Sequence, residues 1–225
     1  MRCLSLAGVM FWAATAAAQP LTLFDGTFND ADWSLAVVVN TSGVTPTAFQ
    51  GTGGNPGTSR LTLLGQGGAN GSTVETASFR LGFSYNPSVQ GAVSGISFRG
   101  DHMLGPNAGA VSGTFAFALR QGGVVYRTDP TVFPTLFNWQ VLTASGLGPL
   151  TRVSPSGPAL PNFTTGGPLD FGFYVGFLLP SGGGGAEGVA VDNFDLVITP
   201  VPEPSSLGLA VLAGVAGFAR WRRRR

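Results

Sequence analysis

Apolar residues alternate with small or polar ones along several stretches, and this pattern restricts the fold of the chain more than any other feature. Residues 78–85 read S-F-R-L-G-F-S-Y, and residues 170–177 read D-F-G-F-Y-V-G-F. Successive side chains of a β-strand point to opposite faces, so each such strand has one apolar face to bury. We therefore predict an all-β fold, an antiparallel β-sandwich of jelly-roll type, over residues 19–199, with the phenylalanines facing inward.

The connections between these strands carry the residues that turns require. The chain has 35 glycines and 16 prolines but only 10% charged residues, which is typical of short strands joined by many turns. The clearest hairpin runs from Thr114 to Arg127, with Gln121-Gly122-Gly123 as its turn. Residues 43–60 are predicted to form a long loop with a tight turn at 53–57.

The segment from Val201 to Arg225 has a different organisation. Pro202-Glu203-Pro204 favours an extended chain, and the thirteen residues Leu207–Ala219 are all small or apolar. A helix over about residues 207–221 would cover roughly 20 Å of a hydrocarbon core of about 30 Å, with Trp221 at the headgroups. The terminal arginines resist transfer across a bilayer and should stay in the cytoplasm; they are Arg220, Arg222, Arg223, Arg224 and Arg225. We predict a short transmembrane helix with its N-terminal end outside.

This order of a Pro-Glu-Pro triplet, a short apolar helix and an arginine cluster resembles the PEP-CTERM protein-sorting domain, and the resemblance covers residues 200–225. It implies export to the envelope of a Gram-negative-type bacterium and recognition by an exosortase, a membrane-embedded transpeptidase that removes the helix. It also implies association with extracellular polysaccharide and biofilm matrix. The alternative is an ordinary single-span membrane anchor. A nucleic-acid partner is disfavoured because the arginines adjoin an apolar helix rather than a folded basic face.

The N-terminal residues have the form of a secretory signal peptide over residues 1–18. Arg2 supplies the positive charge, Leu4–Trp12 the apolar centre, and Ala16-Ala17-Ala18 the cleavage site. Cys3, the single cysteine, leaves with the signal, which excludes disulfides and thiolate metal sites in the mature chain. The exported residues 19–199 carry six arginines and ten carboxylates, and this net charge of −4 disfavours nucleic acid and anionic membranes as partners.

The two ends of the exported domain also resemble jelly-roll carbohydrate-binding and laminin-like domains. Phe24-Asp25-Gly26 lies near the start, and residues 191–198 read V-D-N-F-D-L-V-I. The resemblance implies that the first and last strands pair, and it bears on the sandwich topology rather than on an activity.

Catalytic signals are scarce in this sequence. The single histidine, His102, is expected at the surface, and the chain has no Gly-x-Ser-x-Gly elbow, phosphate-binding loop or histidine pair. Aspartates near both ends of the domain suggest a calcium site with Asp25 and Asp192 as ligands, although solvated turn residues explain such aspartates more often; the five are Asp25, Asp30, Asp32, Asp192 and Asp195. Apart from structural calcium, we expect no cofactor.

Aromatic side chains supply the remaining signal, because a flat ring can stack on a sugar. Five large polar aromatics are candidates, namely Trp33, Tyr85, Tyr126, Trp139 and Tyr174. At most two should be accessible in a sandwich, and we single out Trp33 and Trp139. The sequence thus predicts a non-catalytic surface or matrix protein that binds polysaccharide. The alternatives are a secreted glycan-active hydrolase and a simple membrane-anchored surface protein.

Overall fold

Strands dominate the chain, as the alternation predicts. The computed structural model describes residues 19–64, 71–105, 112–132, 138–146, 148–178 and 187–202, and residues 20–200 form one compact unit. The predicted signal peptide, the tail helix over 207–221, Glu203, Pro204 and the terminal arginines lie outside the described residues. Among the residues described, no helix has the length and apolar character needed to span a bilayer.

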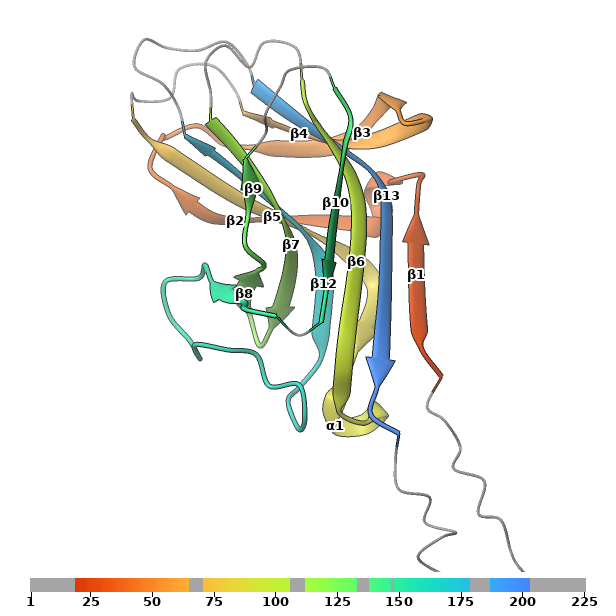
Figure 1. The fold of residues 1–225 in the computed structure, drawn as a ribbon. Coiled ribbons are helices and arrows are strands. Elements are labelled where there is room, and N and C mark those ends of the chain that lie inside the picture. Colours follow the sequence, from red (N-terminus) through yellow and green to blue (C-terminus); the bar gives the residue numbers. More distant parts are fainter. Residues whose placement is uncertain are drawn as a thin grey trace, which may run out of the picture. The chain divides into compact units, whose positions relative to one another are not determined.

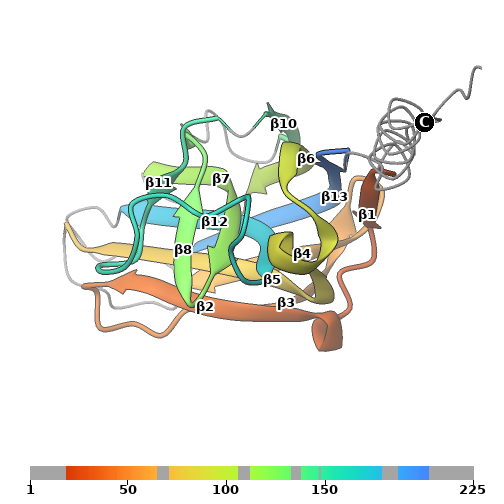
Figure 2. The same cartoon turned by 90° about the horizontal axis from the view of Figure 1, so that it is seen from below.

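Two antiparallel sheets form the sandwich (Figures 1 and 2). Sheet A has the order β10-β6-β13-β4-β3, with β1 also paired to β13; its strands are β1 (Leu21–Asp25), β3 (Thr47–Gly54), β4 (Gly57–Leu64), β6 (Val93–Leu104), β10 (Gln140–Ser145) and β13 (Glu187–Pro200). Sheet B has the order β11-β8-β7-β12-β5-β2, with β9 paired to β7; its strands are β2 (Trp33–Asn40), β5 (Thr73–Tyr85), β7 (Ser112–Gln121), β8 (Val124–Arg127), β9 (Thr131–Val132), β11 (Thr151–Arg152) and β12 (Leu169–Leu178). Among its described residues the unit also has two short helices, η1 (Asp30–Asp32) and α1 (Pro87–Gln90). The prediction of an all-β antiparallel sandwich is confirmed.

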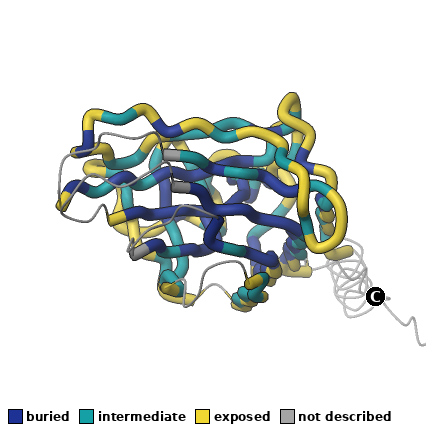
Figure 3. Tube along the Cα trace, turned by 90° about the horizontal axis from the view of Figure 1, so that it is seen from above, coloured by how far each residue is buried: buried dark blue, intermediate teal, exposed yellow. Residues whose placement is uncertain are grey.

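The core lies between the sheets and is built from the alternating residues of the central strands (Figure 3). On β12 every second residue from Leu169 to Phe177 is buried in it, and β7 contributes Phe115, Phe117 and Leu119 in the same way. The predicted hairpin is confirmed, since β7 ends at Gln121 and β8 begins at Val124.

On β5 the alternation of apolar and polar residues does not give the correct face for Phe79. Phe79 was expected to face the same way as Phe83, but it packs in a separate cluster with Tyr174 on the outer face of sheet B. The pairing of β5 with β12 is irregular between Asp170 and Gly172, and this bulge reverses the facing of residues on its two sides. The reversal also turns Arg80 inward, towards Asp25.

The predicted long loop over residues 43–60 is wrong, because β3 and the first half of β4 occupy most of it. The sequence of β3, T-A-F-Q-G-T-G-G, lacks an apolar alternation, since β3 is an edge strand that gains order from pairing with β4. The tight turn expected at 53–57 does join these two strands.

The first and last strands pair, as the resemblance implied. β1 and β13 are antiparallel from Leu21 opposite Ile198 to Asp25 opposite Phe194. The chain therefore enters and leaves the sandwich at the same end, the lower end in Figure 1.

Candidate functional site

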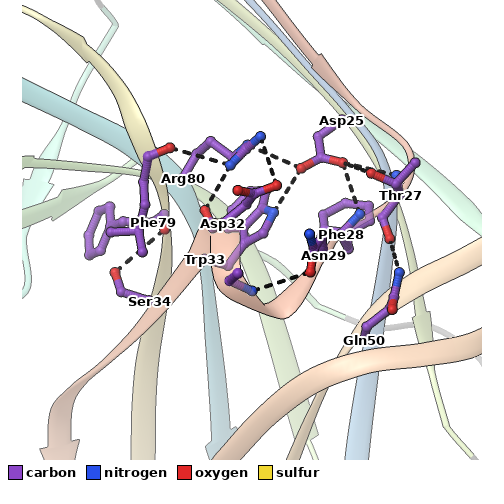
Figure 4. A network of polar contacts seen from close by, with 12 residues as sticks. Asp25, Thr27, Phe28, Asn29, Asp32, Trp33, Ser34, Gln50, Phe79 and Arg80 are labelled. Atoms are coloured by element: carbon purple, nitrogen blue, oxygen red, sulfur yellow. Dashed lines mark hydrogen bonds and ion pairs between the residues drawn. The ribbon is translucent and has the colours of Figure 1, made fainter.

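Asp25 organises the crossing of the chain from sheet A to sheet B (Figure 4). Its Oδ1 accepts hydrogen bonds from the Thr27 and Phe28 backbone N–H groups, both at 2.9 Å, and from the Thr27 hydroxyl at 3.1 Å. Its Oδ2 accepts from Trp33 Nε1 at 2.8 Å and lies 3.2 Å from Arg80 Nε. These contacts hold Phe28 at a φ of 49°, a left-handed conformation that a bulky residue rarely adopts.

Hydrogen bonding outweighs burial at this carboxylate. Burial acts to raise the pKa of Asp25, but the donors from Phe28, Thr27 and Trp33 bring that pKa below its ordinary value of 3.8. The carboxylate therefore stays charged inside the fold and anchors the turn. Its oxygens are already occupied by protein donors, so the described structure gives it a structural role.

Trp33 lies in the core beside this carboxylate and is 4% exposed. Its ring stacks on Phe28 with centroids 5.2 Å apart, meets Phe194 edge-on, and has the buried Arg60 guanidinium 5.8 Å from its centroid. No face of the ring is free for a sugar. Tyr85, Tyr126 and Tyr174 are likewise buried, and of the five aromatic candidates Trp139 alone is partly exposed.

Asp192 and Asp101 lie directly opposite each other on β13 and β6, and both are buried. The tip of the β3–β4 hairpin covers them, because Asn55 donates its backbone N–H to Asp192 and its side-chain amide to Asp101 at 3.2 Å. Asn193 donates its backbone N–H to Asp192 at 2.7 Å and its side-chain amide to Asp101 at 2.9 Å. The pair is thus closed off by amides.

The two predicted calcium ligands, Asp25 and Asp192, lie in different surroundings. Asp25 is saturated by protein donors, whereas Asp192 shares a buried cluster with Asp101. Across the described ranges, no three histidine, cysteine or acidic side chains are grouped as a metal site requires. Calcium at Asp25 and Asp192 stays a prediction.

Asp192 should make stability depend on pH. Burial raises its pKa above the ordinary 3.8, and repulsion from Asp101 and Asp25 adds to this against the donors from Asn55 and Asn193. A raised folded-state pKa means that this group's contribution to stability is complete below 3.8 and is lost as pH rises through the folded value. Relative to wild type, Asp192→Asn should therefore gain stability between about pH 3.5 and pH 7, measured by urea unfolding. A constant difference across that range would contradict the assignment.

The outer face of sheet B is closed as well. Small residues form its floor, and Tyr174 lies over Gly176 with its hydroxyl towards Thr114. Arg120 stacks over Phe79 at 4.5 Å and Arg127 over Tyr174 at 5.1 Å. The aromatic rings of this face are therefore covered by guanidinium groups and do not form an open platform.

Strand β10, at the edge of sheet A, has a hollow on each of its two sides. The inner hollow, about 250 Å³, opens between the sheets and runs from buried Phe98 and Phe117 to exposed Asp129 and Ser145. The outer hollow, about 270 Å³, lies on the outer face of sheet A. Outward residues from three strands line the outer hollow in two adjacent rows, and all but Val197 are polar. The rows are Asp195, Arg99 and Thr143, then Val197, Ser97 and Ser145.

Trp139 immediately precedes β10, so the sequence prediction of a binding residue falls at the start of this strand. The outward residues that follow it along β10 are Val141, Thr143 and Ser145, all exposed. The sequence predicted a strand here but not the hollows beside it, because they depend on β6, β7 and β13, which lie far away in the chain.

His102 is not at the surface, contrary to expectation. It lies on β6, is 1% exposed, and stacks on Phe115 with centroids 4.6 Å apart. Burial lowers its pKa to about 4, against the opposite effect of Asp101. It is therefore a neutral core residue near pH 7.

Solved structures resemble this sandwich at low identity. The family 11 carbohydrate-binding module from Clostridium thermocellum, in complex with a β-1,3-1,4-mixed-linked tetrasaccharide, is 12% identical, with a TM-score of 0.47 over 80% of this chain and 96% of that one. The CBM22-1 xylan-binding domain of Paenibacillus barcinonensis Xyn10C is 12% identical, with a TM-score of 0.40 over 84% and 99%. A structure of infectious bursal disease virus is 10% identical, with a TM-score of 0.38 over 90% and 39%. These likenesses carry nothing about ligands, and no curated protein sequence matches the chain.

The tail gives the clearer finding. Residues 200–225 match the family model described as the PEP-CTERM protein-sorting motif. Pro202, the first residue of the Pro-Glu-Pro triplet, is described and exposed. Residues 200–225 are therefore a PEP-CTERM protein-sorting motif, which implies an extracellular protein sorted by an exosortase.

Proposed function

We propose that the sandwich binds polysaccharide outside the cell along strand β10, after the sorting motif has delivered it. The observation that carries this proposal is the pair of hollows on the two sides of an exposed edge strand that begins next to Trp139. From Trp139 to Ser145 the strand extends about 20 Å, so a bound chain of several sugars would contact both the ring and the hollows. The polysaccharide we propose is the exopolysaccharide of the biofilm matrix.

The chemistry of the site suits a sugar chain. The hydroxyl groups of Thr143 and Ser145 occupy successive outward positions on β10, beside Arg99 and Asp195. The hydroxyl groups both donate and accept hydrogen bonds, Arg99 donates and Asp195 accepts, as sugar hydroxyls require, while the ring of Trp139 offers an apolar face for stacking. Carboxylates outnumber arginine in the two hollows, which favours a neutral over an acidic polysaccharide.

Binding is favoured over cleavage by the placement of the acids. A glycosidase holds two carboxyl groups about 5–9.5 Å apart on either side of one glycosidic bond. Asp129 lines the inner hollow and Asp195 the outer one, so β10 separates them. The buried pair Asp101 and Asp192 is covered by amides. We propose a non-catalytic protein on these grounds.

A retention assay on the native exopolysaccharide tests the proposal. Trp139→Ala should weaken binding about 2- to 10-fold, because a stacked ring contributes about 0.5–1.5 kcal/mol. Phe49→Ala is the matched control, since Phe49 is also a partly exposed aromatic of sheet A but lies on β3, at the other edge. Equal loss in both variants, or no retention of wild type, would contradict the site. Release of reducing ends by the purified protein would show a hydrolase instead.

The organisation that we propose has three parts, a signal peptide at 1–18, the sandwich at 19–199 and the sorting segment at 200–225. In this scheme the helix over 207–221 holds the chain in the inner membrane, with its arginines in the cytoplasm, until the exosortase acts. The sorting motif supports this order of events.

A further inference from the structure

The folded domain reaches the first residue of the sorting motif. β13 ends at Pro200, and the Ser94 hydroxyl donates to the carbonyl groups of Thr199 at 2.9 Å and Pro200 at 3.3 Å. Pro202 is only two residues further along the chain. Six residues, 201–206, separate the last strand from the apolar run, and even fully extended they span about 20 Å. A chain held by its tail therefore keeps this end of the sandwich near the membrane.

The end of the sandwich from which the chain leaves carries no charge in its connecting segments. We call it the charge-free end; it consists of residues 86–92, 121–123 and 154–168, which contain no Asp, Glu, Lys, Arg or His. It lies beside the exit of the chain, because Val93 at the start of β6 pairs with Pro200 (Figure 1).

Hydrogen bonds join the three segments into one surface. Ser88 donates its N–H to the Gly166 carbonyl at 3.2 Å, and Val93 donates to the Phe163 carbonyl at 2.8 Å. The Gln121 side chain donates to the carbonyl of Asn162 at 3.0 Å and accepts from the Asn162 N–H at 2.7 Å. The backbone of this end is thus held in place by the fold.

Two apolar side chains project from the charge-free end. Val89 is 75% exposed on α1, and Leu160 is 62% exposed in the segment that leads to β12. Neither has a role in the core, so both are available to contact a surface outside the domain.

We propose that the charge-free end docks on the lipid headgroup layer of the membrane that holds the tail. The exported domain has a net charge of −4, so an anionic leaflet repels most of its surface. The segments of this end contain no charged side chain that has to lose water on contact, and Val89 and Leu160 can enter the interface. A charged group that does contact these segments is the exposed Arg152 guanidinium, which donates to the Gly157 carbonyl and is a cation that anionic headgroups attract. The short tether raises the effective concentration of the surface at the bilayer, so a weak contact is sufficient. This inference rests on the proposed anchoring by the tail.

Fluorescence quenching in vesicles tests the docking. The full chain with Cys3→Ser receives a single cysteine, at Val89→Cys or at Val141→Cys, labelled with an environment-sensitive dye. Val141 is 55% exposed and lies opposite Asp101, eight residues along β6 from the pairing of Val93 with Pro200, or about 26 Å away. Vesicles contain phosphatidylethanolamine and phosphatidylglycerol, with a quencher on a shallow lipid position.

Docking predicts at least twofold stronger quenching of the dye at position 89 than at position 141, and a return to equality when Leu160→Asp is added to the Val89→Cys chain. Equal quenching at both positions, in chains that float with the vesicles, would overturn the docking while leaving the anchoring intact. Chains that do not float would instead refute the anchoring. Protection of position 89 only when the exosortase is present would show a protein contact and overturn the lipid docking.

Discussion

Replacing Asp25 with alanine should lower the free energy of unfolding by about 3–5 kcal/mol, enough to remove much of the stability of an ordinary domain. The substitution leaves Trp33 Nε1, the N–H groups of Thr27 and Phe28, and Arg80 without their acceptor inside the fold. It also releases the left-handed conformation of Phe28 on which the crossing between the sheets depends. Urea unfolding followed by tryptophan fluorescence measures the loss.

Asp32→Ala is the matched control. Asp32 pairs with the same arginine, at 3.3 Å from Arg80 Nη2, but its side chain is 42% exposed. A solvent-exposed ion pair contributes little, so this variant should lose less than about 1 kcal/mol. Similar losses in the two variants would show that Arg80, rather than the donors gathered on Asp25, carries the effect.

The hydrogen bonds to Asp25 also make the free energy of unfolding depend on pH. The pKa of Asp25 is lowered on folding, so its contribution is present above the ordinary 3.8 and is lost as pH falls through the folded value. Asp192 has the opposite sign, because its pKa is raised. The destabilisation by Asp25→Ala should therefore shrink below pH 3.8, and unfolding of both proteins at pH 2 and pH 7 measures this change.

The sequence predicted the parts of the fold that depend on local pattern. The alternation of apolar residues identified β7 and β12, and Gly122-Gly123 identified the hairpin turn. Each of these features depends only on residues that are neighbours in the sequence. Phe79 was placed on the wrong face, since the bulge that reverses it exists only in the pairing of β5 with β12. β3 was missed because an edge strand of small and polar residues has no period of its own.

In the candidate site, too, the features that depend on one residue were predicted and those that depend on distant strands were not. Trp139 was found because an aromatic residue is visible in the sequence, whereas the hollows beside β10 require four strands from distant parts of the chain. The charge of Asp25 is visible in the sequence and leads to the calcium prediction, whereas the donors that surround this carboxylate appear only in the structure. Trp33 was chosen for its ring, and the structure places that ring between Phe28 and Phe194.

Every chain recovered from the cell surface should have lost its tail. If the exosortase engages Pro202-Glu203-Pro204 at the outer face of the inner membrane and separates the sandwich from its helix, the mature protein ends near residue 204. The fold is compatible with this, because β13 is complete at Pro200 and removal of everything after residue 204 leaves each described strand intact. Intact-mass analysis of protein recovered from the native cell surface should find no chain that ends at Arg225.

Two comparisons separate sorting from simple anchoring. In cells without the transpeptidase, chains should keep the tail and stay in the membrane fraction, whereas surface recovery of full-length chains in both kinds of cell would leave only a membrane anchor. Glu203→Ala should block processing if the triplet is recognised, while leaving the apolar run and the arginines that set the topology unchanged. Normal processing of that variant would refute recognition of the triplet but not the orientation of the tail. Because Pro202 and Pro204 disfavour a helix, the sequence predicts that the enzyme meets an extended peptide only a few residues from the folded domain.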